Sequence, residues 1–275
     1  FKREYFMSYP DNVMVMRLTS DSKKGKLSRI ISLESLHTDK TITADSHTIT
    51  MTGYPTPVSG DKRVGDAWKN GLKYAQQLVV KNKGGKISVV DGTKLKVEDA
   101  DEIIVLMSAA TNYVQCMGDS YNYFSQEDPL EKVQAMLHKV ADKKYTALLA
   151  THQKDYHSLY DRMRLNLGNL PEAPVAPTDS LLKGMDENTN SELENQYLEM
   201  LYFQFGRYLL ISSTRVGLLP PNLQGLWCNT INTPWNGDYH LNINLQMNHW
   251  PAEVANLSEL HLPLVEWTKQ QVASG

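Results

Sequence analysis

The sequence predicts a multidomain fold in which a β-domain is followed by a helical connector and by the opening of an all-α domain. Short β-branched and aromatic segments, separated by turn residues, fill residues 1–125. A helix-start motif follows at Asp128, and apolar residues then recur with the helical period. The predicted domain limits are therefore 1–125, 126–180 and 181–275.

The β-domain is predicted from seven segments that Gly, Asp, Asn and Pro separate. These segments are REYFMSYP, NVMVMRLTS, KLSRIISLES, SHTITMTGY, LKYAQQLVVK, GKISVVDG and EIIVLMSAATNY. Many short strands with turn signals between them are typical of a β-sandwich. This region holds no cluster of candidate catalytic groups, so we expect it to support a site elsewhere.

The connector begins at residues 128–131, Asp-Pro-Leu-Glu, which supply an N-cap, a proline at the first helical position and a capping-box Glu. A second helix is predicted from Tyr145 to Met163. Residues 169–179 contain three prolines in eleven residues, which predicts a stiff linker.

The all-α part begins with a predicted capping box between Ser191 and Glu194. Apolar residues then follow the 3.6-residue period and predict the apolar face of a long helix, of which Leu193, Leu201 and Phe205 are expected to stay partly exposed in these 275 residues. The residues of this face are Leu193, Tyr197, Met200, Leu201, Phe205, Tyr208 and Leu209. Another helix is predicted to start near Ser258.

Composition excludes several classes of function for these 275 residues. The net charge of -3 comes without a long basic block, which argues against nucleic-acid binding. No apolar run is long enough to span a membrane. Cys116 and Cys228 match neither a disulfide framework nor a zinc pattern, so two buried thiols are expected. We expect no metal and no cofactor.

Residues 238–251, DYHLNINLQMNHWP, carry the most informative pattern. From His240 to Asn248, polar side chains alternate with Leu, Ile and Met. Strict alternation predicts an extended segment, because successive side chains of a strand point to opposite faces. The polar side consists of neutral amides and one imidazole, which can both donate and accept hydrogen bonds.

Aromatic residues surround this segment. Trp227, Trp235, Tyr239 and Trp250 offer faces on which the C–H side of a sugar ring can lie. Aromatic surface with convergent neutral polar groups is what a small-molecule pocket needs. On composition alone, a buried polar network that joins a loop to a helix explains these residues equally well.

This stretch closely resembles glycoside hydrolase family 95, the inverting α-L-fucosidases. The shared motifs are LQGLW at 223–227, PW at 234–235, LNIN at 241–244 and MNHWPAEVANLSEL at 247–260. The resemblance implies an N-terminal super-β-sandwich, a helical linker and the beginning of an (α/α)6 barrel. We expect the β-sandwich domain to be incomplete at its N-terminus and the barrel to be truncated at its C-terminus.

The same resemblance implies the roles of individual residues. Asn242 and Asn244 would hold the water that attacks the anomeric carbon, and His240 and Trp235 would bind the sugar. An extended run would let 240, 242 and 244 face one cavity. Inversion also needs an acid and a base, usually two carboxylates about 6.5–9.5 Å apart. The family's acid Glu and assisting Asp are expected outside residues 1–275, so this chain alone is expected to be inactive.

The implied reaction is release of terminal L-fucose from α-linked, commonly α-1,2, fucosides of an oligosaccharide or glycan. Two alternatives remain open, an α-L-galactosidase of the same family and a non-catalytic glycan-binding fragment. An (α/α)6 enzyme acting on glucosides or gluconates would usually have carboxylates at Asn242 and Asn244. A purely structural scaffold is disfavoured by the amides and aromatic rings of 222–251. Family resemblance suggests a periplasmic or extracellular location, and the sequence does not predict an oligomeric state.

Overall fold

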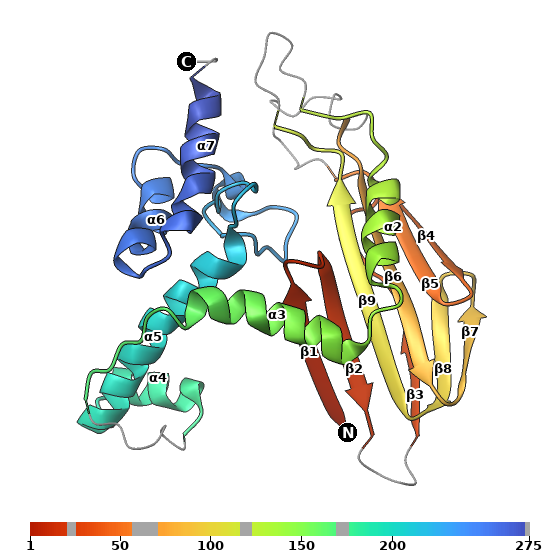
Figure 1. Cartoon of the computed structure of the whole chain (residues 1–275), viewed down its shortest axis with the longest axis horizontal. Helices are drawn as coiled ribbons and strands as arrows, with labels where there is room; N and C mark the ends of the chain where they lie inside the picture. Colours follow the sequence, from red (N-terminus) through yellow and green to blue (C-terminus); the bar gives the residue numbers. More distant parts are fainter. Residues whose placement is uncertain (21–25, 57–70, 116–122, 169–175, 273–275) are drawn as a thin grey trace. The chain divides into compact units, whose positions relative to one another are not determined.

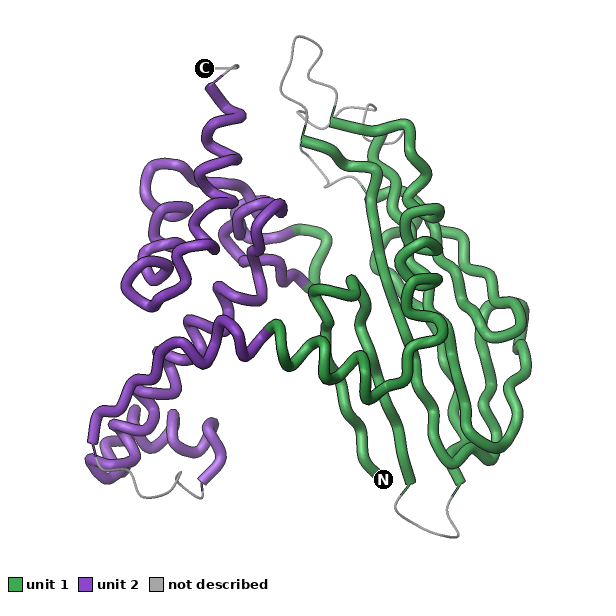
Figure 2. The backbone as a smooth tube through the Cα atoms, in the orientation of Figure 1, with its two compact units in different colours: residues 1–155, 229–232, 274 green, residues 156–228, 233–273, 275 purple. Residues whose placement is uncertain are grey.

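The computed structural model describes residues 1–20, 26–56, 71–115, 123–168 and 176–272. They form two compact units, residues 1–155 with 229–232 and residues 156–228 with 233–273 (Figure 2). The change of unit at residue 155 lies inside helix α3 (Tyr145–Tyr160). The domain limits at 125 and 180 remain predictions.

Unit 1 contains two antiparallel sheets (Figure 1). The larger has the order β1 (Lys2–Ser8), β2 (Val13–Thr19), β9 (Glu102–Thr111), β6 (Tyr74–Lys83), β5 (Thr48–Gly53), β4 (Lys40–Asp45). The smaller has the order β3 (Leu27–Ile31), β8 (Lys94–Ala100), β7 (Lys86–Val90). The predicted β-domain is thereby confirmed, although β4 and β8 were not among the predicted segments.

The larger sheet buries apolar side chains on both faces, because neighbouring residues of a strand point in opposite directions. Ile103 and Val105 of β9 pack against the smaller sheet, in a cluster with Leu95 and Val97 of β8. Leu106, the residue after Val105, packs on the other face with the helices. One apolar layer therefore lies on each face of the central strands.

Helix α2 (Pro129–Val140) covers this other face beside β6 and β9 (Figure 1). Its predicted N-cap is confirmed, since the Asp128 carboxylate accepts a hydrogen bond of 2.9 Å from the Leu130 backbone N–H. Among the described residues, the Glu131 side chain makes no capping-box bond. The helix buries Val133, Leu137 and Val140 against the sheet.

Unit 2 is helical. Its elements are the end of α3, α4 (Thr178–Asp186), α5 (Glu192–Ser213), η1 (Pro234–Gly237), α6 (Asn244–Val254), η2 (Ser258–His261) and α7 (Leu262–Gln271). Helices thus follow the sheets along the chain, as predicted. That they begin an (α/α)6 barrel stays a prediction.

Helix α5 begins as predicted but buries a different face. The Ser191 hydroxyl and the Glu194 side chain form the reciprocal bonds of a capping box. Leu193 and Phe205 are exposed and Leu201 is partly buried, as expected from the sequence, and Tyr208 is exposed as well. The buried apolar residues are Leu198, Leu210 and Ile211. Apolar residues lie all around α5, so periodicity alone does not identify the face that packs.

Buried Arg207 of α5 holds the end of α3. Its guanidinium donates to the backbone carbonyls of Tyr160 at 2.8 Å, Met163 at 3.0 Å and Leu159 at 3.1 Å. These carbonyls belong to the last turn of α3 and the residues after it, where helical partners run out. A cation is also favourable at the negative end of the helix dipole.

Three remaining expectations have mixed outcomes. No helix in the described ranges is long and apolar enough to cross a membrane. Cys228 is exposed, so its predicted burial is wrong, and Cys116 lies outside the described residues. Residues 169–175 of the proline-rich linker also lie outside them, and α4 begins directly after Pro177.

Candidate functional site

A four-residue turn organises the loop before α6. Asn222 and Gly225 exchange two backbone hydrogen bonds of 3.1 and 3.0 Å. Gly225 has φ +73°, and a Cβ at this position would lie 2.6 Å from the ring of Trp227. Glycine is therefore required here for both its left-handed backbone and its lack of a side chain.

The same turn binds both α6 and the loop beyond it. The Asn222 carbonyl accepts a 3.0 Å hydrogen bond from the side chain of Asn248 in α6. The Gln224 side chain donates a 2.8 Å bond to the carbonyl of Pro234. Sequence reasoning assigned no role to Asn222, Gln224 or Asn248. The motif LQGLW contains part of the turn. The hydrogen bonds from Gln224 to Pro234 and from Asn248 to Asn222 join residues ten or more positions apart, so no local sequence pattern predicts them.

Three successive residues after Pro234 have left-handed backbones. Trp235 has φ +55°, Asn236 has φ +56° and Gly237 has φ +62°. This conformation is uncommon for non-glycine residues and a genuine outlier for bulky ones. Such strain persists only where the surroundings impose it, and it concentrates at ligand-binding sites. The run exposes the Trp235 ring, whose surface is 74% accessible.

His240 lies against this exposed ring. The Trp235 and His240 rings meet edge to face, with centroids 5.9 Å apart and planes at 86°. The Nδ1 atom of His240 is buried and has no hydrogen-bond partner among the described residues. An unpaired buried imidazole nitrogen is costly, so a ligand group that bonds to it would recover that energy. The structure thus brings together the two predicted sugar-binding residues.

The predicted extended conformation of 240–248 is wrong. Residues Leu241–Ile243 form a turn, and α6 begins at Asn244. Asn242 therefore lies in the turn and Asn244 in the first position of the helix, both with exposed side chains. Neither amide makes a hydrogen bond to another described residue. Both remain able to bind a ligand or water, but alternation along a strand does not align them.

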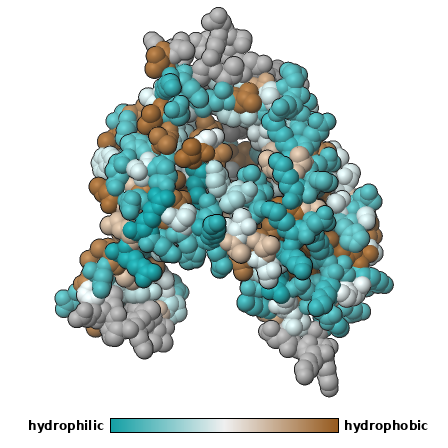
Figure 3. All heavy atoms as spheres, viewed as in Figure 1, coloured by the Kyte–Doolittle hydropathy of each residue, from teal (hydrophilic) through white to brown (hydrophobic). Residues whose placement is uncertain are grey.

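Helix α6 has two apolar sides, which accounts for the misleading pattern. Its buried side carries Leu245, His249 and Ala252. Its exposed side carries Ile243, Met247, Trp250 and Val254. Figure 3 shows apolar side chains at the surface of the part of the helical unit that holds α6 and α7. The spacing of the buried residues is helical, and the alternation arises because apolar residues fall on both sides.

The start of α6 lacks a side-chain cap. Ile243 occupies the N-cap position and cannot accept a hydrogen bond from the first turn. Backbone carbonyls replace it in part, since Leu245 N–H donates to His240 at 3.0 Å and Met247 N–H to Ile243 at 2.9 Å. The positive end of the helix dipole therefore lies beside the Asn242 and Asn244 amides.

His249 is the main titratable group that α6 buries. Burial lowers its pKa, and the nearby His261, whose ring is stacked at 5.7 Å, lowers it further. Its Nδ1 lies 3.0 Å from the Leu245 carbonyl, which favours the tautomer protonated at Nδ1. Within the described part of the chain, no three His, Cys, Asp or Glu side chains are grouped to hold a metal ion. The histidine pair is therefore interpreted as a packing contact.

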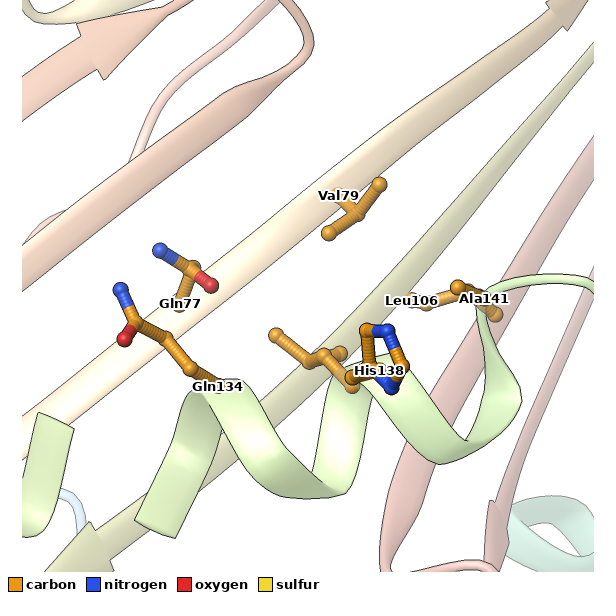
Figure 4. A pocket seen from close by; sticks show the side chains of 7 residues that line it. Gln77, Val79, Leu106, Gln134, His138 and Ala141 are labelled. Atoms are coloured by element: carbon orange, nitrogen blue, oxygen red, sulfur yellow. The ribbon is translucent and has the colours of Figure 1, made fainter. Parts of the chain in front are cut away.

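A small pocket of about 160 Å³ lies in unit 1 between α2 and strands β6 and β9 (Figure 4). Its lining consists of Gln77, Val79, Leu106, Gln134, Leu137, His138 and Ala141. The lining has no carboxylate and no Trp, Tyr or Phe ring. All four predicted site residues belong to unit 2, so this pocket is a separate feature.

Comparisons with known proteins match the sheets and the helices of the chain to two different domain families. Residues 1–116 match the profile of the glycosyl hydrolase family 65 N-terminal domain. Residues 144–275 match that of the glycosyl hydrolase family 95 catalytic domain. Both profiles describe domains of glycosyl hydrolases, one over the sheets and one over most of the helices.

Full-length relatives identify the family. The chain is 36% identical to the probable α-fucosidase A of Aspergillus niger over 273 residues, 97% of this chain and 32% of that protein. It is 34% identical to α-L-fucosidase 2 of Arabidopsis thaliana over 288 residues, 100% of this chain and 34% of that protein. The chain belongs to glycoside hydrolase family 95, which confirms the resemblance. It spans about a third of the length of these curated relatives.

Proposed function

We propose that the protein is an α-L-fucosidase that releases terminal L-fucose from α-linked, principally α-1,2, fucosides. The observation that carries the proposal is the exposed, unpaired Asn242–Asn244 amide pair at the uncapped start of α6, next to His240. The names of the relatives in Aspergillus niger and Arabidopsis thaliana support the sugar specificity. The fold of unit 2 supports the position of the site.

The amide pair suits a single-displacement mechanism with inversion. Asn242 and Asn244 accept hydrogen bonds from an attacking water and hold its oxygen toward the anomeric carbon. As that oxygen bonds to the anomeric carbon, its O–H groups become stronger donors, so the two amide oxygens hold it more tightly. These interactions strengthen as water becomes a nucleophile, so they lower the barrier rather than the free energy of substrate binding.

The amides need two carboxyl groups to complete the reaction. An amide oxygen is a very poor base, so an Asp must take the proton of the water. A Glu must protonate the leaving oxygen. We propose that both lie outside residues 1–275, in the part of the relatives' length that this chain does not span.

His240 and Trp235 provide the sugar specificity. The exposed face of Trp235 suits the C–H side of a pyranose ring, and the buried Nδ1 of His240 offers one hydrogen bond. Fucose carries a methyl group where L-galactose carries a hydroxymethyl group. The bulky His240 ring leaves room for the methyl group and excludes the larger substituent, which favours fucose over L-galactose.

The test compares Asn242→Ala and Asn244→Ala in the intact protein, with Asn229→Ala as the matched control. Asn229 is an exposed amide in the same loop, away from the turn before α6. We expect each active-site variant to lower kcat by about 10²- to 10³-fold with a smaller change in KM, and the control to keep normal kinetics. NMR of the first product anomer from an α-L-fucoside should show inversion.

Other outcomes separate the alternatives. Binding of fucosides without turnover in the wild-type protein would favour a non-catalytic glycan-binding protein. A His240→Thr variant should lose activity on fucosides and lose less, or gain, on L-galactosides, by about ten- to two-hundredfold in discrimination. Faster turnover of L-galactosides by the wild-type protein would instead identify an α-L-galactosidase. Near-normal kcat in folded Asn244→Ala would contradict the amide-held water.

A further inference from the structure

The left-handed run at Trp235–Gly237 needs an anchor outside itself. Two backbone bonds close the local turns, from Asn236 N–H to Thr233 and from Asp238 N–H to Trp235, both 3.1 Å. Both bonds join residues within or next to the run, so they do not tie it to the rest of unit 2. A strained segment held only by its own turns would relax to other backbone conformations.

Gln224 supplies that anchor. Its Nε2 donates at 2.8 Å to the carbonyl of Pro234, which belongs to the same peptide plane as the nitrogen of Trp235. Fixing this plane restrains the φ angle of Trp235. Its Oε1 lies near the other end of the run, 3.2 Å from the place where a Gly237 Cβ would be. One side-chain amide thus bonds to the start of the strained segment and lies close to its end.

The backbone of Gln224 is fixed by the turn in which it lies. Its backbone N–H donates to the Asn222 side chain at 2.9 Å, inside the turn that Asn222 and Gly225 close. The Asn222 carbonyl is in turn bound to Asn248 of α6. The turn therefore links the helix that begins with Asn244 to the loop that presents Trp235.

We propose that Gln224 is a positioning residue that sets sugar affinity by holding the Trp235 ring against His240. The inference rests on the proposed function for the role of Trp235 and His240, and on the described contacts for the role of Gln224. Gln224 touches neither of the two proposed water-binding amides. Its loss therefore changes how the sugar ring is held and leaves the activation of water intact.

The test uses the intact protein with two substitutions, Gln224→Met and Gln224→Glu. Methionine keeps the length of the side chain without a donor, and glutamate places an acceptor against the Pro234 carbonyl. Gln204→Met is the control, because Gln204 also donates to a backbone carbonyl of unit 2, that of Met163, far along the chain from Trp235. Gln204 also accepts a 2.9 Å bond from Arg207, so a thermal melt checks that this variant keeps its fold. We expect both Gln224 variants to raise KM for an α-L-fucoside and the Kd for L-fucose about three- to tenfold. The kcat should stay within about twofold, and the control should match wild type.

Tryptophan fluorescence provides a readout that does not depend on the reaction. The difference between each protein and its Trp235→Phe counterpart isolates the emission of Trp235, whose environment should change in both Gln224 variants and not in the control. Unchanged Trp235 emission, or a fall in kcat at unchanged KM, would overturn the assignment. A wild-type protein that neither binds L-fucose nor hydrolyses a fucoside would overturn the proposed function, while the emission would still decide whether Gln224 holds the ring.

Discussion

Strand β8 of unit 1 and residues 240–248 of unit 2 carry the same sequence pattern and adopt different structures. In β8, Leu95 and Val97 are fully buried while the lysines and the glutamate between and beside them point outward. Residues 240–248 have the same alternation of apolar and polar residues, but they form a turn followed by the first residues of α6. Alternation is therefore compatible with both structures.

The difference lies in what each segment can pair with. Strand β8 is the central strand of its sheet and exchanges hydrogen bonds with β3 and β7 on either side. Residues 240–248 contain one β-branched side chain, Ile243, among Asn, Gln, Leu and Met. Asn is depleted in strands, whereas Leu, Met and Gln are good helix formers. Alternation predicts a strand only where residue type and neighbouring strands agree with it.

The largest expected effect comes from placing a charge on the buried side of β8. Val97→Asp would leave an unpaired carboxylate in the apolar layer between the sheets, where Val97 is fully buried. We expect a loss of about 4 kcal/mol or more in the free energy of unfolding, measured by chemical denaturation. Lys96→Thr, on the outward side of the same strand, should cost about 0.5 kcal/mol or less. Equal effects at the two positions would contradict the observed alternation in β8.

Leu245→Ala and Met247→Ala test the helical conformation of α6. Leu245 is buried and Met247 exposed, because two residues apart on a helix point to different sides. The first variant should lose about 2–4 kcal/mol of unfolding free energy, and the second less than about 1 kcal/mol. In an extended segment both residues would share one face and the two losses would be similar. Thermal and urea melts of the paired variants decide between these structures.

Capping signals in the sequence predicted helix starts well. Asp128 and Ser191 both accept a backbone hydrogen bond in the first turn, as their side chains and positions indicated. Such bonds are local, since the two partners lie within three residues of each other. The buried face of α5 depends instead on which neighbours pack there. Nothing in the local sequence distinguishes Leu193, which is exposed, from Leu198, which is buried.

The candidate site shows the same limit. Motifs identified Trp235, His240, Asn242 and Asn244, but the contact between the Trp235 and His240 rings was not predicted. The bond from Gln224 to Pro234 was not predictable, because it depends on a turn that brings residues ten apart together. The uncapped start of α6 was also missed, since the alternating pattern suggested a strand across it. Their catalytic and binding roles remain predictions that the proposed variants test.

The smallest expected effect concerns how the free energy of unfolding depends on pH through His249 of α6. Burial lowers the pKa of this imidazole below its ordinary value of 6.5, so the folded protein favours the neutral form. Above pH 6.5 both folded and unfolded states hold the neutral ring, and its contribution to stability is fully present. As the pH falls below that value, the unfolded state binds a proton that the folded state does not, and the free energy of unfolding decreases. The loss continues until the pH passes the lowered pKa of the folded state.

Urea denaturation at several pH values between about 8 and 5 measures this slope. A His249→Leu variant removes the titrating group while keeping an apolar side chain at the buried position, and its slope should be shallower than that of the wild type. Because His261 is stacked on His249 and bonded to Glu253 at 3.0 Å, the same pair of curves is measured in a His261→Gln background, where the two proteins differ only at His249. The partly exposed His240 belongs to the loop rather than to the buried side of α6, and it remains in both proteins. Identical slopes would show that His249 is not buried as a neutral ring, which would contradict the packing of the helical side that Leu245 and Ala252 share with it.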